Sequence, residues 1–485
     1  MIKSENKKIL KATSILTVAD FIGKIFDFIR IILITSFFSP AIFGIYSLAI
    51  DTNVFFSCFI LPGLSSIIIK YFPEYVQKNR KKAAKFFSTV FFILILKSII
   101  LAFLIYIASN YIALYYLKPE LDGLIKYSSI LIILIPLNVS LQQFVNSSEL
   151  FLINGLSRII CSISGLFFLI LFYLLGYNEY SLIISYLLSN LLQIIVLLYP
   201  MRKYFTFSSF QIDKEILKYW YPLVLANLMK NISGNLHTFI IGRFVDKEGI
   251  GLFKIAEKSV NIGFSFVDPY INSIQVIAFN TFNKSKERFI QIINVHNKFS
   301  SFLITFTAII GLLGAKFFFQ LLYGDDYLLA LPYFIYFLLA GVMGASNLSF
   351  LRPILFAHKK TNHYFKFITI YSIIQLFFLV ILTIKFQIWG IIYALIIGRM
   401  IGTIMGIIIC RRLEKKLKIM PIVFPAALWS FLFFLSEILN YIYHIETKNY
   451  IYFSSSILFL IIMQQAKFIK FSEIYKYLKY KKIKD

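Results

Sequence analysis

Long apolar stretches follow one another along almost the whole chain, and each is close to the length of a membrane-spanning helix. Such a helix needs about 20 mainly apolar residues. Fourteen windows of this kind are found, at 14–38, 41–69, 87–116, 127–147, 151–176, 180–200, 219–243, 249–280, 295–322, 328–351, 364–385, 388–410, 422–443 and 449–466. This pattern predicts an all-α polytopic membrane protein with about fourteen transmembrane helices.

Charged residues interrupt the first window at regular intervals. Asp20, Lys24, Asp27 and Arg30 fall on one broad face of a helix. A charge at the centre of a span costs at least ~2.5–3.5 kcal/mol on insertion scales, so this face needs a polar environment. Two interpretations remain open. Either the charges neutralise one another along the helix, or they line a hydrated cavity in which the two cations meet an anionic substrate.

Polar residues also form long stripes on the seventh and eighth windows. These residues are Asn227, Lys230, Ser233, Gly234 and His237 on the former, and Lys254, Glu257, Lys258, Asn261, Ser265 and Asp268 on the latter. Because such a stripe does not face lipid, it is expected to line a cavity or to pair across the bundle. Asp51 on the second window is isolated in sequence. It is either an ion-coupling carboxylate or a structural partner of Lys24 or Lys258.

A row of small residues marks the twelfth window. Gly398, Gly402 and Gly406 are spaced four apart, which favours close helix packing. Arg399 lies beside this row and is expected to face the cavity.

The distribution of Lys and Arg predicts the orientation of the chain. With the N-terminus in the cytoplasm, cytoplasmic segments hold 35 of these bases and outside loops only seven, so both termini are predicted to be cytoplasmic. The formal charge of +26 lies almost wholly in those segments, where it meets anionic lipid headgroups. The spans hold seven bases and six acids, so the net charge does not itself indicate a cationic path.

The composition removes several functional classes. The chain is 59% hydrophobic and 15% charged, with a mean hydropathy of +0.78, which excludes an ordinary cytosolic enzyme and a nucleic-acid binder. No Walker motif and no metal-binding spacing of Cys or His occurs, so neither a metal nor a cofactor is expected. The segment Gly324–Tyr327 carries an acidic pair and is interpreted as the turn before a helix.

An internal repeat appears when the chain is displaced by 207 residues against itself. The matched pairs are Gly44 with Gly251, Tyr46 with Phe253, Ala49 with Ala256, Pro62 with Pro269, Ser66 with Ser273, Ile67 with Ile274 and Phe72 with Phe279. Transporters are often built from such repeats. We therefore expect two pseudo-symmetric six-helix lobes at 1–206 and 207–418, two further helices at 419–466, and a basic cytoplasmic tail at 467–485.

Several short segments resemble those of a known superfamily. These are Phe-Gly-Ile-Tyr-Ser-Leu-Ala at 43–49, Pro-Gly-Leu-Ser-Ser at 62–66 followed by Lys70–Tyr71, and Tyr-Gly-Asp-Asp-Tyr at 323–327. With the layout of six, six and two helices, they resemble the polysaccharide flippases of the multidrug/oligosaccharidyl-lipid/polysaccharide exporter superfamily. The similarity is greatest to the Wzx-type O-antigen and capsule translocases of the bacterial inner membrane.

The resemblance implies two MATE-like lobes around a central cavity. By alternating access they would carry an undecaprenyl-pyrophosphate-linked oligosaccharide from the inner to the outer leaflet. The cations implied for the pyrophosphate or acidic sugars are Lys24, Arg30, Lys230, Lys254 and Lys258. The candidates for ion coupling are Asp20, Asp27, Asp51, Glu257 and Asp268. Membrane lipids, a polysaccharide polymerase and a chain-length regulator are the expected partners, and nucleic acid is not.

Three alternatives remain. A MATE-like drug or cation antiporter shares the fold but usually stops at twelve helices. A lipid-II-type flippase is chemically adjacent. A membrane glycosyltransferase or polymerase is more distant, since the outside loops here are short.

Overall fold

The computed structural model describes residues 2–60, 62–206, 214–267, 271, 281–282, 285–358, 360–418, 420–443 and 448–465, and all regular structure among them is helical. The chain divides into two compact units. Unit 1 comprises 1–254, 322–327 and 379–391, and unit 2 comprises 255–321, 328–378 and 392–485. The lobe boundaries expected from the repeat stay a prediction.

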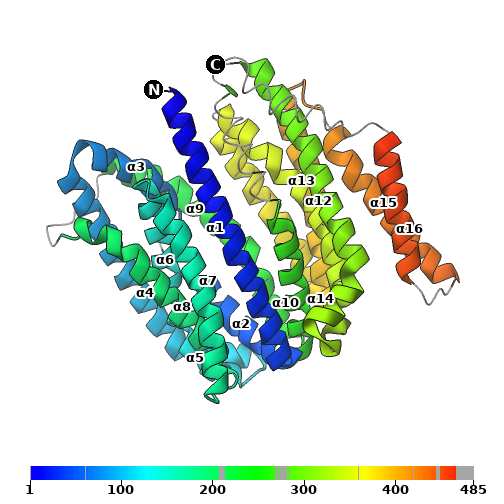
Figure 1. Ribbon diagram of the computed structural model, residues 1–485, viewed down its shortest axis with the longest axis horizontal. Helices are drawn as coiled ribbons and strands as arrows, with labels where there is room; N and C mark the ends of the chain where they lie inside the picture. Colours follow the sequence, from blue (N-terminus) through cyan, green and yellow to red (C-terminus); the bar gives the residue numbers. More distant parts are fainter. Residues whose placement is uncertain are drawn as a thin grey trace. The chain divides into compact units, whose positions relative to one another are not determined.

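Unit 1 is built mainly from nine α-helices and one short 3-10 helix among the described residues. They are α1 (Ile2–Phe37), α2 (Pro40–Ser57), α3 (Leu64–Lys78), α4 (Arg80–Tyr116), α5 (Leu121–Ser128), α6 (Leu131–Ser147), α7 (Phe151–Leu174), α8 (Tyr180–Met201), the short η1 (Arg202–Tyr204) and α9 (Lys214–Phe244). Helix α7 packs along both α1 and α8 (Figure 1). This arrangement brings three helices of different character together, because α1 is charged while α7 and α8 are mainly apolar.

Unit 2 contains most of the remaining helices. They are α10 (Lys247–Ser265), α12 (Lys286–Tyr323), η2 (Asp325–Ala330), α13 (Leu331–Ala357), α14 (Thr361–Leu413), α15 (Met420–Tyr443) and α16 (Lys448–Gln465), of which α10, α12 and α14 also contribute residues to unit 1. A buried cluster that includes Phe289, Leu351, Phe367 and Cys410 joins α12, α13 and α14. Cys410 is thus a packing residue.

The helix boundaries agree with most of the predicted windows and contradict one. The window 41–69 is wrong, since α2 ends at Ser57 and α3 begins at Leu64. Between them, Gly63 adopts a φ of 78°, a left-handed conformation that stops a helix and favours glycine. The predicted break between the eleventh and twelfth windows is confirmed by Gln387, whose φ of 50° and ψ of −123° interrupt α14.

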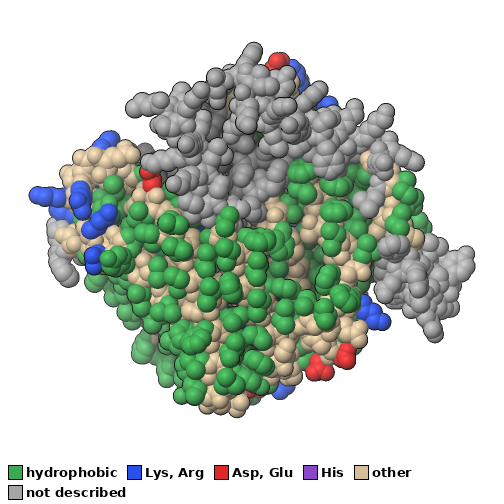
Figure 2. Space-filling view, in the orientation of Figure 1, with side chains coloured by type: hydrophobic (Ala, Val, Ile, Leu, Met, Phe, Trp, Pro, Cys, Tyr) green, Lys and Arg blue, Asp and Glu red, His purple; other side chains and the backbone are tan. Residues whose placement is uncertain are grey.

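Seven helical segments of the described chain are long and apolar enough to cross a membrane. The all-α polytopic class is therefore confirmed, while the number fourteen stays a prediction. Figure 2 shows one face covered mainly by hydrophobic side chains, with basic and acidic ones towards its margins. Exposed apolar residues such as Phe103 of α4 and Phe167 of α7 are those that a hydrocarbon environment would cover.

The helix ends repeat at the predicted displacement of 207 residues. Matched ends are Phe37 of α1 with Phe244 of α9, and Tyr116 of α4 with Tyr323 of α12, and the matched starts are Pro40 of α2 with Lys247 of α10. The residues after the second pair, Leu117 and Gly324, both have positive φ, of 58° and 80°. The same backbone turn therefore ends equivalent helices. The later matches at Pro269, Ser273, Ile274 and Phe279 lie outside the described residues.

Two matched glycines of the repeat lie at the crossing of α2 with the start of α10. A methyl group on Gly44 would overlap the carbonyl oxygen of Lys247, and one on Gly251 would overlap that of Pro40. Because Lys247 is itself the match of Pro40, each helix presents the same surface to the other. The crossing is thus reciprocal, and only glycine fits on either side.

Candidate functional site

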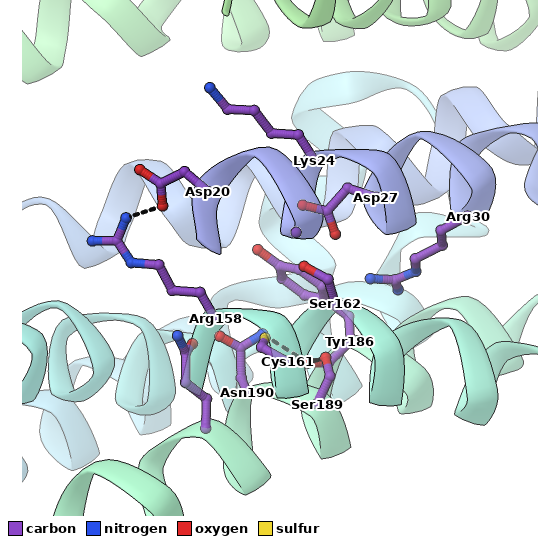
Figure 3. Close-up of a pocket in the computed structure, with 12 residues that line it drawn as sticks. Asp20, Lys24, Asp27, Arg30, Arg158, Cys161, Ser162, Tyr186, Ser189 and Asn190 are labelled. Atoms are coloured by element: carbon purple, nitrogen blue, oxygen red, sulfur yellow. Dashed lines mark hydrogen bonds and ion pairs between the residues drawn. The ribbon is translucent and has the colours of Figure 1, made fainter. Parts of the chain in front are cut away.

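A cavity of about 330 Å³ lies in unit 1 between α1, α7 and α8. Its lining is strongly polar for a region enclosed by apolar helices. The lining residues are Asp20, Gly23, Lys24, Asp27, Arg30, Arg158, Cys161, Ser162, Tyr186, Ser189, Asn190 and Gln193 (Figure 3). The charged face predicted for the first window therefore borders a cavity, and all four of its charged residues take part.

An ion pair between α1 and α7 lies at one end of the cavity. The guanidinium of Arg158 binds the carboxylate of Asp20 and also donates to Oε1 of Gln142 at 3.2 Å (Figure 3). About a third of each charged side chain remains accessible, 31% for the arginine and 36% for the aspartate. Both side chains are therefore accessible to water, which allows the arginine to exchange the aspartate for another anion. The count of bases in cytoplasmic segments includes Arg158, although it falls inside the apolar window 151–176 and the structure places it within α7.

Arg30 lies at the other end and is held by α8. Its Nη2 donates to the hydroxyl of Ser185 at 3.0 Å, and its guanidinium carbon lies 5.4 Å from the ring centre of Tyr186. Gly165 of α7 leaves the space for it, since a Cβ there would lie 3.2 Å from Nη1. The contacts position the guanidinium at the cavity, where it can bind an anion through further N–H groups.

Asp27 and Lys24 lie between the two arginines along α1. The carboxylate of Asp27 points towards the hydroxyl of Ser162, and the charge of Arg30 acts on it (Figure 3). Lys24 lines the cavity while its ammonium group points away from α7 and α8 (Figure 3). Asp20 and Asp27 of α1 thus find their polar neighbours on α7, one in an arginine and the other in a hydroxyl. The structure therefore favours the cavity interpretation of this face over a ladder confined to α1.

Asp51 belongs to a different and drier site in unit 1. Its carboxylate lies 2.8 Å from Nζ of Lys254, whose side chain is only 3% exposed. Neither of its expected partners, Lys24 and Lys258, occupies this position. Lys254 lies one turn after Gly251 on α10, so the glycine crossing brings the two helices close enough for the pair to form. Two predicted site residues therefore neutralise each other.

Further predicted residues come together in unit 2. Arg399 of α14 packs against Gly344 of α13, where a Cβ would meet the arginine side chain, and the charge of Glu257 acts on it. Lys258 lies on the same helix as Glu257 and is half-buried. Arg399 and Glu257 are thus neighbours. From the sequence, Arg399 was expected to face the cavity and Glu257 was a candidate for ion coupling.

Two of the predicted substrate-binding cations and coupling acids have no described side chain. Lys230 lies within α9, but its side chain is outside the described part, and Asp268 lies outside the described residues altogether. In the part of the chain that is described, no group of three or more His, Cys, Asp or Glu residues could hold a metal ion.

Comparison with known sequences identifies a family. A family model described as "Polysaccharide biosynthesis protein" matches residues 33–332. The teichuronic acid biosynthesis protein TuaB of Bacillus subtilis (strain 168) is 22% identical over 285 residues. That match covers 53% of this chain and 54% of TuaB, so the chain aligns with about half the length of this curated relative.

Solved structures share the fold over a longer region. The lipid II flippase MurJ, in an inward closed conformation, superposes with a TM-score of 0.72 at 18% identity, covering 93% of this chain and 99% of MurJ. An inward-facing multidrug resistance MATE family transporter of the MOP superfamily gives a TM-score of 0.66 at 16% identity, covering 81% and 95%. The chain therefore has the fold of these multi-pass membrane proteins.

Proposed function

We propose that this chain, which belongs to the polysaccharide biosynthesis protein family, is a flippase of the MOP superfamily. Its substrate is an undecaprenyl-pyrophosphate-linked oligosaccharide of O-antigen or capsule type. It moves this substrate from the inner to the outer leaflet of the bacterial inner membrane by alternating access. Membrane lipids surround it, and a polymerase and a chain-length regulator act on what it delivers. The observation that carries the proposal is the charged cavity of unit 1 within a chain of this family.

The chemistry of the cavity supports an anionic substrate. A pyrophosphate that enters a region of low dielectric constant needs compensating cations, and arginine binds phosphate oxygens through paired N–H groups. We assign this role to Arg30, whose donors are only partly used by Ser185. Arg158 joins it when it exchanges Asp20 for phosphate, and Lys24 adds charge at the edge. Lys230, Lys258 and Arg399 are proposed to serve the substrate at later stages, whereas Lys254 is a structural partner of Asp51.

Among the coupling candidates, Asp27 is the best placed. Asp20 is occupied by Arg158, Asp51 by Lys254, and Glu257 acts on Arg399. Asp27 faces a hydroxyl and lines a cavity large enough for water, so it can exchange a proton or a small cation. Asp268 keeps its place among the candidates.

Deletion of the gene tests the function directly. We expect lipid-linked repeat units to accumulate while surface polysaccharide disappears, and the chain carrying Arg30→Gln should not restore display. A chain carrying Lys126→Met is the matched control, since this lysine pairs with Asp122 outside the cavity. Failure to form repeat units at all would instead indicate an enzyme of assembly.

Two further outcomes distinguish transporters that share this fold. If polysaccharide display is unchanged and drug tolerance falls, the chain is an antiporter. If cell-wall synthesis stops and lipid II accumulates, the substrate is lipid II, as it is for the flippase MurJ. Either result would overturn the proposed substrate while leaving the fold unaffected.

A further inference from the structure

Unit 1 contains a pair of equivalent contacts, related by the internal repeat, at the end where α1, α4 and α9 stop. Lys118 follows α4, and its Nζ donates to the carbonyl oxygens of Gly242 and Val245 at 2.8 Å each and of Tyr116 at 3.2 Å. Gly242 lies in the last turn of α9 and Val245 directly follows this helix. The last carbonyl groups of a helix have no hydrogen-bond partner within the helix. All three ammonium protons are therefore used on backbone oxygens, in a side chain that belongs to a residue only 8% exposed.

The second contact is the counterpart of the first. Tyr327 follows α12, and its hydroxyl donates to the carbonyl oxygen of Phe38 at 2.9 Å. Phe38 directly follows α1 as Val245 directly follows α9, and the two residues are 207 positions apart. Each repeat thus supplies a donor, from the turn after its long helix, to the same carbonyl of the other repeat. Both donors belong to buried residues, with Tyr327 at 1% exposure.

Close packing surrounds the two contacts. Gly242 lies so near the ring of Tyr116 that a Cβ on it would come within 2.6 Å, and the hydroxyl of that tyrosine lies 3.0 Å from Oγ1 of Thr52. The reciprocal glycine crossing of α2 and α10 belongs to the same unit. Two more exposed contacts lie nearby. Lys247 pairs with Glu120 at 3.1 Å, and Arg243 donates to the carbonyl oxygen of Tyr115 at 2.7 Å. Exposed pairs of this kind contribute little to stability.

We propose that Lys118 and Tyr327 form a two-part clasp that keeps this end of unit 1 closed, and that Lys118 is its stronger half. Charge distribution predicts that this end faces the outside. The purpose of the opening, release of substrate to the outer leaflet, rests on the proposed function, but the closure itself does not.

The two halves are chemically unequal. A charged ammonium with three acceptors binds more strongly than one neutral hydroxyl with a single acceptor. Burial lowers the pKa of Lys118, and the carboxylates of Asp246 and Glu120 act in the opposite direction and favour the charged form. Opening therefore needs water to replace three charged hydrogen bonds at one half and a single neutral hydrogen bond at the other.

A distance measurement tests the clasp. Spin labels are placed at the exposed positions Tyr111→Cys and Glu248→Cys, in full-length chain that otherwise lacks cysteine and is held in lipid nanodiscs. We expect one dominant short distance in the parent. Lys118→Met should raise the fraction of a longer distance roughly tenfold or more, the range that charged hydrogen bonds allow. Tyr327→Phe should raise the same component by about threefold, as for one neutral hydrogen bond.

The control is Lys126→Met, which removes a neighbouring lysine whose partner is Asp122 on the same helix. It should leave the distances unchanged. The clasp is refuted if Lys118→Met and Tyr327→Phe both leave the parent distribution intact, or if the control produces the same shift. Should Lys118→Met fail to fold, Tyr327→Phe alone decides, because it removes a single oxygen atom.

The same samples separate the clasp from the proposed function. A shift in distance with no transport of lipid-linked oligosaccharide by the parent supports the clasp and overturns the function. Transport by the parent with no shift in the distance of either variant supports the function and overturns the clasp.

Discussion

The cavity beside α1 and the Asp51–Lys254 pair are both made of acids and bases within helices, yet they differ in access to water. In the cavity the charges come from α1 and α7 around about 330 Å³ of space, and the Asp20–Arg158 pair keeps about a third of each side chain exposed. In the pair the two charged atoms lie 2.8 Å apart, and the aspartate is 31% exposed while the lysine is only 3% exposed. The difference therefore lies in the basic residue, because the arginine of the cavity is accessible to an anion and the lysine of the pair is not.

The largest expected effect comes from breaking the dry pair. Asp51→Asn removes the carboxylate but leaves the lysine charge buried, which costs about 3–5 kcal/mol of folding stability in a fully buried pair and less here, because the aspartate is 31% exposed. We expect most of the folded protein to be lost, as measured by thermal unfolding in detergent. The double variant Asp51→Asn with Lys254→Gln should recover much of the melting temperature. If Asp51→Asn alone is as stable as the parent, the Asp51–Lys254 pair matters no more for stability than an accessible pair such as Asp20–Arg158.

The next effect is on transport rather than stability. Arg30→Gln keeps a donor for Ser185 but loses the charge that binds phosphate, so transport by proteoliposomes should fall by tenfold or more, the equivalent of about 1.4 kcal/mol. Its melting temperature should stay close to that of the parent. Arg30→Lys, which retains the charge, should lose less. A large loss of stability in Arg30→Gln would place this arginine with the structural charges instead.

Asp27→Asn should change what drives transport. If this carboxylate exchanges a proton or cation, the variant loses the dependence of transport rate on the ion gradient while the folded protein remains. The measurement compares rates with and without the gradient in parent and variant. Asp20→Asn is the comparison, since its carboxylate is bound to Arg158. Retention of the full gradient response in Asp27→Asn contradicts the assignment.

The smallest effect is expected at the edge of the cavity. Lys24 points away from α7 and α8, so Lys24→Gln removes charge without removing a contact to those helices. Substrate affinity should weaken by about threefold or less, the scale of a partly exposed charge, and the effect should diminish in high salt. A loss as large as that of Arg30→Gln would extend the working site to the other side of α1.

The local sequence pattern was sufficient to predict the charged face of α1 but not the residues on other helices that contact it. The spacing of Asp20, Asp27 and Arg30 is a property of one helix and predicted that they share one face, which the structure places at a cavity. Arg158 was missed because a loop and a helix start look alike when charges are counted alone. The partner of Asp51 was missed because the crossing of two helices some 200 residues apart depends on three-dimensional packing.

The fold shows the same division. Apolar windows predicted most helices, and the displacement of 207 residues predicted where equivalent ones end. The window 41–69 failed because the left-handed turn at Gly63 lies within an otherwise continuous apolar run. A hydropathy pattern registers solvent preference along the chain and does not register a single backbone dihedral angle.

The two halves of the clasp have a consequence for how a duplicated gene diverges. The acceptors at Phe38 and Val245 are main-chain atoms, which no codon change can remove, whereas the donors have become a lysine in one copy and a tyrosine two positions further along in the other. The two copies therefore end their helices at matching main-chain positions, while the side chains that donate from the following turns differ.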